Sequence, residues 1–390
     1  MTGLAAWGRD AEEQPAAVRA LREALRADEV AHAWLVVGPP GVGQADLARS
    51  LAMALNCEQA AAPDEACGTC ATCERIARDR DELLQVFEPE GAAYVVDTVR
   101  TEWVATATRS LTAGRRRVLR ITAADRANVP AQNAFLKLLE EPPPSVVWIL
   151  EAEEESALLD TILSRCRRLA VVPWGVDALR RRARDLGVAD ERVEAVARAA
   201  LGSPNRLADL ADPDVAAARD RHLGVVDALA VGGPGLVVPT AKGLVAWAKG
   251  RVGPLRERHA EELAALERDL GVDESGRGWP PGMRARVLKR QERLERFEQR
   301  RAIDLALDDV GSYLRDLLAV QSAASDDVLV NLDHAEALRR DAQRLPAADV
   351  VRALAAVARC REALDRNGNP ELQLERLLMA IALPLFRVAA

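Results

Sequence analysis

The sequence predicts an α/β fold with a mostly parallel sheet that helices cover on both faces, followed by an all-helical second part. Up to residue 174, short apolar segments alternate with segments of helical spacing, which is typical of a parallel sheet. A glycine-rich segment joins the first expected strand to a helix. Beyond residue 174 only helical spacing remains. Aromatic content is 3%, so the cores are expected to consist of Ala, Leu and Val, of which Ala and Leu favour helices.

The elements of the first part follow in order along the chain. An amphipathic helix is expected at residues 17–31. Strand Ala33–Val37 then runs into the segment GPPGVG at 38–43, and a helix follows at 45–55. A strand, a glycine-rich loop and a helix form the opening unit of α/β nucleotide-binding folds. The remaining expected elements are strands Leu84–Phe87, Val118–Thr122, Val146–Glu151 and Leu169–Val172, with helices at 97–112, 130–140 and 156–164.

The second part has helical spacing almost throughout. Residues 176 to about 230 are helical with a few turn signals, and the glycine-rich residues 232–235 are a candidate linker. Helical spacing continues from 236 to 385, with one Gly- and Pro-rich interruption between Gly271 and Gly282. At roughly 100–200 residues per domain, this length corresponds to two to four domains. We expect three domains: residues 1–174, 175–231 and 236–390.

The overall charge argues against a general nucleic-acid binder. The chain has 53 Lys and Arg against 60 Asp and Glu, a net charge of −7, whereas nucleic-acid-binding domains are usually basic. Any DNA contact must therefore be local or shared with partners. The first residues show no basic segment followed by an apolar core, and no apolar run approaches the ~18 residues of a membrane helix. We expect a cytoplasmic protein with reduced cysteines.

The segment Gly38–Ala45 fits the phosphate-binding frame G-x-x-x-x-G-K-[ST] except at its last two positions. In that frame, backbone N–H groups curl around phosphates at a helix N-terminus, the lysine neutralises phosphate charge, and the hydroxyl binds Mg²⁺. Here Gln44 replaces the lysine and Ala45 replaces the hydroxyl residue. The backbone cradle could survive, because its glycines are kept: Gly38, Gly41 and Gly43. A vestigial phosphate loop and an ordinary glycine-rich turn are both open at this point.

The acidic half of an ATPase site is also missing. ATPases of this kind carry acidic residues directly after an apolar strand, where they hold Mg²⁺. The candidate strand is Val118–Ile121, which is followed by Thr122 and Ala123, and Asp125 comes too late. The domain is therefore expected to keep the shape of an ATPase without the chemistry, and not to bind ATP productively. Whether the loop still holds a nucleotide passively is open.

Four of the six cysteines form a cluster with the spacing C-x9-C-x2-C-x2-C: Cys57, Cys67, Cys70 and Cys73. Four thiolates around one ion are a common structural zinc site, and short C-x2-C steps let neighbouring sulfurs converge. No His lies in this stretch, so we expect a closed structural Zn²⁺ site. Disulfide pairing is the alternative, which a cytosolic chain disfavours. Cys166 and Cys360 are isolated.

These features together resemble one known family. The strings that carry the resemblance are HAWLVVGPPGVG from His32, NAFLKLLEEPP from Asn133 and TILSRC from Thr161, together with the four cysteines. They resemble the AAA+ subunits of bacterial DNA polymerase III clamp loaders, over about residues 5–210. The motor subunits of that family, gamma and tau, keep the lysine and acids that this chain lacks, so the chain is similar to the delta-prime subunits. The resemblance implies a RecA-like AAA+ domain with an inserted zinc module (57–73), a helical lid and a helical collar.

The resemblance also implies a role. A delta-prime-like chain would form a hetero-oligomer with gamma/tau motor subunits and delta, and would help to load the sliding clamp on primer–template DNA. Arg165 matches the arginine of the family's S-R-C motif, which acts in trans as an arginine finger on the ATP of a neighbouring motor subunit. The chain itself would then be catalytically inactive, within a complex that polymerises DNA. A solvated arginine in the basic run 165–168 is the alternative for Arg165.

Two further segments stay open. Asn205 stands where motor subunits of the family carry a nucleotide-sensing arginine, and Arg206 is shifted by one position. The stretch 284–301 is a basic helix with eight Lys or Arg against three Glu. It either contacts DNA phosphates or an acidic partner, or is a solvated helix braced by pairs such as Glu292–Arg296.

Two other functions compete with the clamp-loader subunit. An active ATPase with an altered loop would hydrolyse ATP as the purified chain alone. A zinc-dependent DNA-binding module would bind a specific DNA sequence tightly as a monomer, which the acidic net charge disfavours.

Overall fold

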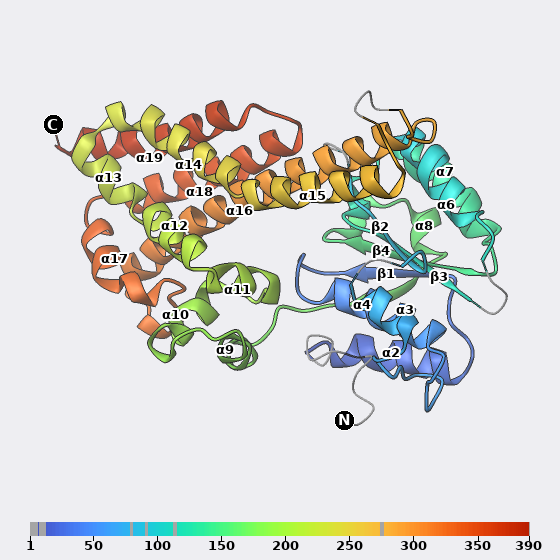
Figure 1. Cartoon of the computed structure of the whole chain (residues 1–390). Coiled ribbons are helices and arrows are strands. Elements are labelled where there is room, and N and C mark those ends of the chain that lie inside the picture. Colours follow the sequence, from blue (N-terminus) through green and yellow to red (C-terminus); the bar gives the residue numbers. More distant parts are fainter. Residues whose placement is uncertain are drawn as a thin grey trace. The chain divides into compact units, whose positions relative to one another are not determined.

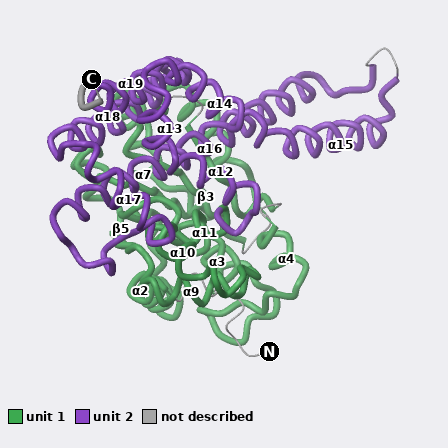
Figure 2. Tube along the Cα trace, turned by 90° about the vertical axis from the view of Figure 1, so that its left-hand side faces the viewer, with its two compact units in different colours: residues 1–209 green, residues 210–390 purple. Residues whose placement is uncertain are grey.

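The computed structural model describes most of the chain: Trp7 and residues 13–78, 81–89, 93–111, 115–273 and 277–389. The chain divides into two compact units, Met1–Asp209 and Leu210–Ala390 (Figure 2). The described part of unit 1 contains a parallel sheet with helices, and that of unit 2 contains helices alone. The predicted sequence of an α/β part and an all-helical part is confirmed. Among the described residues, no helix is both long enough and apolar enough to cross a membrane.

Unit 1 is built on a five-stranded sheet with the order β2-β3-β4-β1-β5, and all its strand pairs are parallel (Figure 1). The strands are β1 (Ala33–Val37), β2 (Leu84–Phe87), β3 (Arg117–Ile121), β4 (Val146–Ala152) and β5 (Arg167–Ala170). All five predicted strands are present, the first two with the predicted bounds. The strands are mostly buried, as expected for a sheet covered on both faces. The edge strand β5 is the exception, because three of its four residues are exposed.

Unit 1 also contains helices, the last of which, α11, continues past Asp209 into unit 2. They are α2 (Pro15–Arg26), α3 (Gln44–Asn56), α4 (Ala71–Ala77), α5 (Val96–Thr98), α6 (Val104–Ala107), α7 (Val129–Glu140), α8 (Asp160–Leu163), α9 (Val176–Asp185), α10 (Asp190–Ala199) and α11 (Pro204–Ala211). Local signals start several of them: Pro15 opens α2, and the side chain of Asn128 accepts a hydrogen bond from the N–H of Ala131 in α7. The helix expected at 97–112 consists of α5, a π-helical turn (Val99–Trp103) and α6.

An aromatic cluster fills one face of the sheet. Trp103 packs edge-on against Tyr94 and Phe135, with ring centroids 5.1 and 5.2 Å away. Phe135 packs in turn against Trp148 of β4. Trp34 of β1 lies on the opposite face, because strand residues alternate between faces and its partner in β4 is the residue after Trp148. Both strand tryptophans are fully buried.

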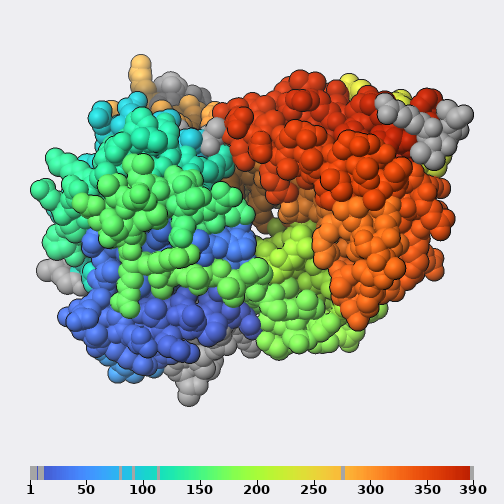
Figure 3. Space-filling model, turned by 180° about the vertical axis from the view of Figure 1, so that it is seen from behind, coloured from blue at the N-terminus to red at the C-terminus, as the bar shows by residue number. Residues whose placement is uncertain are grey.

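Unit 2 consists of helices around one apolar core. They are α12 (Pro213–Leu223), α13 (Val225–Gly232), α14 (Val237–Gly250), α15 (Gly253–Asp269), α16 (Met283–Gln321), α17 (Ala335–Asp341), α18 (Ala347–Asp365) and α19 (Pro370–Ala389). From Ala302 on, the long helix α16 is buried in this core, whereas its first half pairs with α15 outside the core. The loop expected between Gly271 and Gly282 separates α15 from α16. The helices near the C-terminus form much of the face of unit 2 that Figure 3 shows.

The boundary between the units lies between Asp209 and Leu210, within α11. The candidate linker at residues 232–235 lies between α13 and α14 and includes the start of a 3-10 turn, Pro234–Leu236. The division into three domains, with a helical lid at 175–231 and a collar at 236–390, stays a prediction.

Candidate functional site

A glycine loop, residues 38–43, joins β1 to α3 at the carboxyl edge of the sheet. Gly38, Gly41 and Gly43 have positive φ angles of 151°, 77° and 125°, which other residues rarely adopt. A Cβ atom on Gly38 would lie 2.3 Å from the carbonyl oxygen of Val171, so this glycine also lets the chain after β5 approach the loop. The loop therefore has a curled backbone that depends on its glycines.

The side chain of Gln44 turns back onto the glycine loop. Its Oε1 accepts a hydrogen bond from the backbone N–H of Val42 at 3.0 Å, and its Nε2 donates to the carbonyl oxygen of Pro39 at 2.5 Å. Gln44 is only 4% exposed. In phosphate loops such N–H groups donate to the phosphate, whereas here the acceptor is an amide of the same chain. Gln44 thus supplies no positive charge, and it accepts the hydrogen bond of one N–H group of the loop, that of Val42.

Three further side chains hold the carbonyl groups of the glycine loop. The carbonyl oxygen of Val42 accepts hydrogen bonds from Gln14 Nε2 and Trp174 Nε1, each at 2.9 Å. Ser203 Oγ donates to the carbonyl oxygen of Gly41 at 3.0 Å. Gln14 and Trp174 are buried, so their bonds are shielded from water. Nothing in the sequence singles out these three side chains, which lie far from the loop along the chain.

The residues directly after β3 are Thr122 and Ala123, neither of which is acidic. Asp125, further along, accepts hydrogen bonds from the backbone N–H groups of Glu153 and Glu154 at 2.9 and 3.1 Å. Asp125 therefore fixes the chain that leaves β4, which accounts for it without a magnesium ion.

The carboxylate of Glu151, near the carboxyl end of β4, is bound by an arginine. Arg120 of the neighbouring strand β3 donates two hydrogen bonds to it, at 2.5 and 3.0 Å. The side chains are 18% and 12% exposed, so the pair is largely shielded from water. Because the charge of Glu151 is balanced by Arg120, it is not free to serve as a cation ligand.

Asn205 and Arg206 differ in their relation to the glycine loop. Asn205 lies beside it, because its Nδ2 would be 3.2 Å from a Cβ atom on Gly41. Arg206 is buried, and its Nε donates to the carbonyl oxygen of Ala199 at the end of α10, at 2.7 Å. Carbonyl groups at a helix end lack partners within the helix, so this contact gives Arg206 a structural role.

Arg165 lies at the surface, between α8 and β5. One of its terminal nitrogens donates to the carbonyl oxygen of Thr161 at 2.9 Å, and the other pairs with Glu140 at 2.9 Å. The arginine side chain is 35% exposed. Glu140 ends α7 and belongs to the string NAFLKLLEEPP, so the two strings most typical of the resemblance meet at this ion pair.

The neighbours of Arg165 in the basic run have partners of their own. The guanidinium of Arg167 lies over the ring of Trp34, 5.0 Å from its centroid, and Arg168 pairs with Glu155 at 3.0 Å. Burial raises the pKa of Cys166 to about 12, so this thiol is not a nucleophile at neutral pH.

Arg165 and the glycine loop lie at opposite ends of the strands, at the amino and the carboxyl edge of the sheet. In the parallel pair of β1 and β5, Trp34 lies opposite Arg167. The loop follows the carboxyl end of β1, whereas Arg165 precedes the amino end of β5. At about 3.3 Å per strand residue, the four steps from Trp34 to Gly38 correspond to ~13 Å. A phosphate that contacts Arg165 at its edge is therefore not one held by the loop of the same chain.

The four clustered cysteines bring their sulfur atoms together. The Sγ atoms of Cys57, Cys67, Cys70 and Cys73 all lie within 4.8 Å of one another. Four thiolates 2.3 Å from one Zn²⁺ in a tetrahedron are ~3.8 Å apart, so the cluster fits such an ion. All six cysteines of the chain are described, and all six are free thiols, so the disulfide alternative is not formed.

Backbone N–H groups point at these sulfur atoms. The N–H of Cys67 donates to the Sγ of Cys57, and the N–H of Cys70 to the Sγ of Cys67, both at 3.2 Å. The N–H of Thr69 also points at the Sγ of Cys67. The hydrogen bonds from Thr69 and Cys70 lower the pKa of Cys67 to about 6. Burial raises the pKa of Cys73 instead. The N–H groups favour thiolates, which are the form that binds metal.

The cysteine cluster is attached to its surroundings by polar contacts. Cys57 directly follows α3, and Asn56 before it exchanges two hydrogen bonds with the backbone of Arg116 next to β3. On the other side Asp64, 1% exposed, pairs with Arg22 and Arg26 of α2 at 2.5 and 2.9 Å. The cluster thus begins where the helix that starts at the glycine loop ends.

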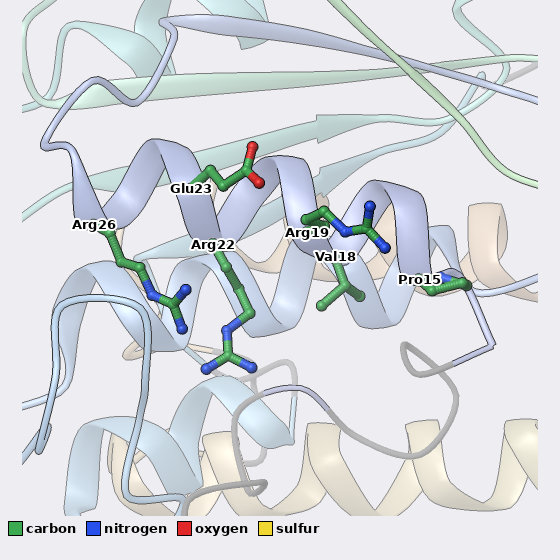
Figure 4. A pocket seen from close by; sticks show the side chains of 6 residues that line it. All are labelled: Pro15, Val18, Arg19, Arg22, Glu23 and Arg26. Carbon is green, nitrogen blue, oxygen red and sulfur yellow. The ribbon is translucent and has the colours of Figure 1, made fainter.

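The same face of α2 borders a hollow of about 320 Å³ (Figure 4). Its lining residues are Pro15, Val18, Arg19, Arg22, Glu23 and Arg26. Two of its arginines already bind Asp64. Its lining residues include no pair of a nucleophile and an adjacent base.

Two family models match the chain. One, described as DNA polymerase III, delta subunit, matches residues 13–174. The other, described as DNA polymerase III, delta subunit, C terminal, matches residues 305–382. Residues 175–304 lie between the two matches.

Curated relatives carry related names. The chain is 39% identical over 169 residues to DNA polymerase III subunit delta' of Pseudomonas aeruginosa, and 31% identical over 170 residues to that of Bacillus subtilis. Each alignment covers 43% of this chain and 50% of the relative, so the chain spans about half the length of these relatives. It is also 33% identical over 216 residues to DNA polymerase III subunit gamma/tau of Mycobacterium bovis, which covers 54% of this chain and 37% of the relative.

Likenesses to solved structures are distant. A DNA polymerase III gamma subunit-related protein of Thermotoga maritima is 15% identical with a TM-score of 0.36, covering 90% of this chain and 98% of the other. The RuvB Holliday junction branch migration motor of the same organism is 21% identical with a TM-score of 0.35, covering 51% and 59%. Neither bears on the function of the chain.

Proposed function

Because the chain belongs to the family of DNA polymerase III delta-type subunits, we propose that it is the delta-prime-type subunit of a clamp loader. In this role it acts in the cytoplasm with gamma/tau motor subunits and delta, and it helps to load the sliding clamp on primer–template DNA. The chain does not hydrolyse ATP. It is a scaffold that donates Arg165 to the ATP site of a neighbouring motor subunit.

One contrast carries this proposal: side chains of the same chain bind the glycine loop, whereas Arg165 is partly exposed at the opposite end of the strands. Nucleotide hydrolysis needs a cation at the phosphates and a carboxylate that holds Mg²⁺. Here the neutral Gln44 stands in place of the cation. The carboxylate of Glu151 is bound to Arg120. These features support a domain that contributes to the site of another subunit and has none of its own.

In the proposed role, Arg165 stabilises negative charge on the transferred phosphoryl group. Negative charge spreads over the oxygens of the transferred phosphoryl group, and a planar guanidinium can contact two of them with parallel N–H donors. In the best-studied cases such an arginine is worth roughly 10³–10⁵ in rate. The neighbouring subunit supplies the nucleotide and Mg²⁺.

In the isolated chain, Glu140 is the partner of Arg165. The pair is exposed on both sides, 35% and 51%, and exposed pairs of this kind contribute ~0.2–1 kcal/mol. A nucleotide phosphate of a neighbouring subunit carries more charge and can displace this carboxylate at little cost. Glu140 then acts as a positioning residue, which keeps the guanidinium at the amino edge of the sheet until assembly.

The cysteine cluster is proposed to hold one structural Zn²⁺. Four soft thiolates are the donor set that favours this ion, and four protein ligands leave no open position for water. The residues that would hold it are Cys57, Cys67, Cys70 and Cys73. When bound, the ion cross-links the segment between α3 and α4 and takes no part in phosphoryl transfer.

Assembly is proposed to use unit 2. Four apolar residues of α19 are 36–56% exposed: Leu372, Met379, Leu383 and Phe386. Their spacing of seven, four and three residues puts them on one face of the helix. Exposed apolar stripes mark interaction sites. Because the relatives are named as subunits of one polymerase, the proposed occupant is the corresponding surface of a neighbouring clamp-loader subunit.

Reconstitution tests the proposal. The full chain is combined with gamma/tau-type subunits, delta and the clamp from one organism, and complex formation, ATP hydrolysis and clamp loading on primed DNA are measured. We expect the chain to enter the complex and to be required for loading, and the chain alone to give no ATP hydrolysis above background. Failure to assemble would contradict the clamp-loader role. ATP turnover by the chain alone would favour an active ATPase with an altered loop.

A further inference from the structure

We propose that a layer of polar side chains fixes which residues lie opposite each other in a two-helix arm of unit 2. The arm comprises residues 253–300, that is, α15 and the first half of α16, and it stands out from the other helices of unit 2 (Figure 2). The polar layer consists of His259 and Glu262 of α15 and of Gln291 and Glu295 of α16. Neither family model covers these residues, so the inference goes beyond the proposed clamp-loader role.

The interior of the arm is polar. Among its described residues only His259 and Gln291 are buried, with 7% and 5% of their surface exposed. Leu263 and Leu266 lie within about 40° of His259 around α15, on the side that meets α16, and both are only half-buried. The same holds for Leu288 of α16. The arm thus places its polar groups where a helix pair normally places its most buried apolar residues.

The residues of the polar layer are bonded to each other across the two helices. Gln291 uses both N–H groups of its amide, because its Nε2 donates to the carbonyl oxygen of His259 and to the carboxylate of Glu262, each at 3.1 Å. Nδ1 of His259 lies 3.1 Å from Oε1 of Glu295. Each of the four residues therefore has a partner on the opposite helix, and a buried polar group that loses its partner is costly.

The apolar residues of the arm repeat in a way that leaves the pairing open. His259 stands seven residues after Val252 and seven before Leu266, and Val287 and Leu294 of α16 are also seven apart. Positions seven apart lie two turns apart on nearly the same side of a helix. A slip of α15 along α16 by seven residues, ~10 Å, would therefore keep apolar residues opposite each other but would separate His259 from its partners. The polar layer discriminates between the two pairings, whereas the leucines do not.

Ion pairs at the edge of the arm agree with the observed pairing but are less able to impose it. Arg256 pairs with Glu295 at 2.8 Å, and Arg284 approaches Glu267 to 4.0 Å. These two pairs are eleven residues apart on both helices, as expected for one antiparallel pairing. The arginine side chains are 61% and 54% exposed, and exposed pairs contribute little to stability. A single buried polar residue can set the register of a helix pair at a cost in stability, which is the role that we assign to the layer.

Photo-crosslinking in the full chain tests this inference. Glu267 is replaced by p-benzoylphenylalanine, and the residues of α16 to which it couples are mapped by mass spectrometry. In the observed pairing the crosslinks should lie around Arg284. In the variant His259→Leu with Gln291→Leu we expect a second set of comparable yield, shifted by seven residues to around position 291. Hydrogen exchange of the α15 amides should be no faster in this variant, because leucines carry no polar groups that need partners.

A control variant separates the polar layer from the general effect of added leucines. It carries Ala260→Leu and Arg296→Leu, both at exposed positions of the arm outside the layer, and it should couple only around Arg284. Glu295→Gln keeps an oxygen that can face His259 and should do the same. Exchange in α18 and α19 should be equal in all variants, since these helices lie outside the arm.

A single set of crosslinks around Arg284 in the variant with leucines at 259 and 291 would overturn the inference. So would faster exchange of α15 in that variant, which would make the layer a source of stability, or an equal second set of crosslinks in the control. The measurement needs neither ATP nor another subunit, so its failure is distinct from failure of the clamp-loader role.

Discussion

The two edges of the sheet in unit 1 differ in how their polar groups are bound. At the carboxyl edge, the N–H of Val42 and three carbonyl groups of the glycine loop are bound by side chains of the same chain. At the amino edge, Arg165 is partly exposed, and its partners in the described part of the chain are a backbone carbonyl and the exposed Glu140. Groups bound in a buried network are costly to expose, whereas an exposed ion pair changes partners at little cost.

Under the proposed role, this difference explains how the domain can do without a nucleotide of its own and still act on that of a neighbouring subunit. The glycines keep the curled backbone, and one replacement, Gln44, supplies an internal partner for an N–H that otherwise faces a phosphate. The amino edge is ~13 Å away along the strands, so the change does not reach Arg165. Mutations can therefore separate nucleotide binding by the glycine loop from the proposed action of Arg165 on a neighbouring subunit.

The largest effect is expected from removing a metal ligand, which leaves the residues of the glycine loop and Arg165 unchanged. Structural zinc sites contribute roughly 10–16 kcal/mol of apparent binding free energy in small zinc-finger peptides. We therefore expect Cys70→Ser to lose its zinc and to have a lower Tm, as measured by metal content and thermal unfolding. Cys360→Ala, in unit 2, is the control and should keep the zinc. Equal zinc content in the two variants would exclude the cluster as the zinc site.

A smaller effect is expected when the internal partner of the loop is removed. Gln44→Ala leaves the Val42 N–H and the Pro39 carbonyl without their bonds, which should lower the free energy of unfolding by ~1–3 kcal/mol in urea titrations. The exposed Gln343→Ala is the matched control and should have no effect. An unchanged free energy of unfolding would contradict this prediction, and tight ATP binding by Gln44→Ala would mean that Gln44 keeps nucleotide out of the loop.

The change Glu140→Gln should have a still smaller effect. The pair with Arg165 is exposed, so the free energy of unfolding should change by less than ~1 kcal/mol. ATP hydrolysis by the reconstituted complex should be retained, because Arg165 is still present. A fall as large as that caused by loss of Arg165 would indicate that Glu140 acts on the nucleotide itself.

No effect on activity is expected when the lost lysine and hydroxyl are restored. The double variant Gln44→Lys with Ala45→Thr still has Thr122 and Ala123 after β3, so it lacks a magnesium ligand there. Its ATP hydrolysis as a purified chain should equal background. Turnover by this variant would show that the substitutions in the glycine loop alone silence the domain.

Local patterns made most of the fold predictable from the sequence. The five strands are short apolar runs, and the glycine loop is marked by its spacing of glycines, so both were found from neighbouring residues alone. The four cysteines were found in the same way, because their close spacing brings their sulfur atoms together.

The contacts that decide the state of the site could not be predicted. Trp174 and Ser203 reach the loop from 132 and 162 residues away, and Glu140 reaches Arg165 from 25 residues away. No periodicity relates such positions, because only the folded chain brings them together. The inward turn of Gln44 is also invisible in the sequence, since a glutamine at this position can equally face solvent.

The most direct test of the central claim is the ATP hydrolysis rate of the reconstituted complex with Arg165→Ala in this chain. If Arg165 serves the site of a neighbour, hydrolysis at that site should fall by roughly 10³ or more, with assembly unchanged by sizing. Arg168→Ala, which removes a neighbouring exposed arginine, should leave the rate unchanged. An unchanged rate in Arg165→Ala would contradict the claim, and Arg165 would then be a surface arginine paired with Glu140.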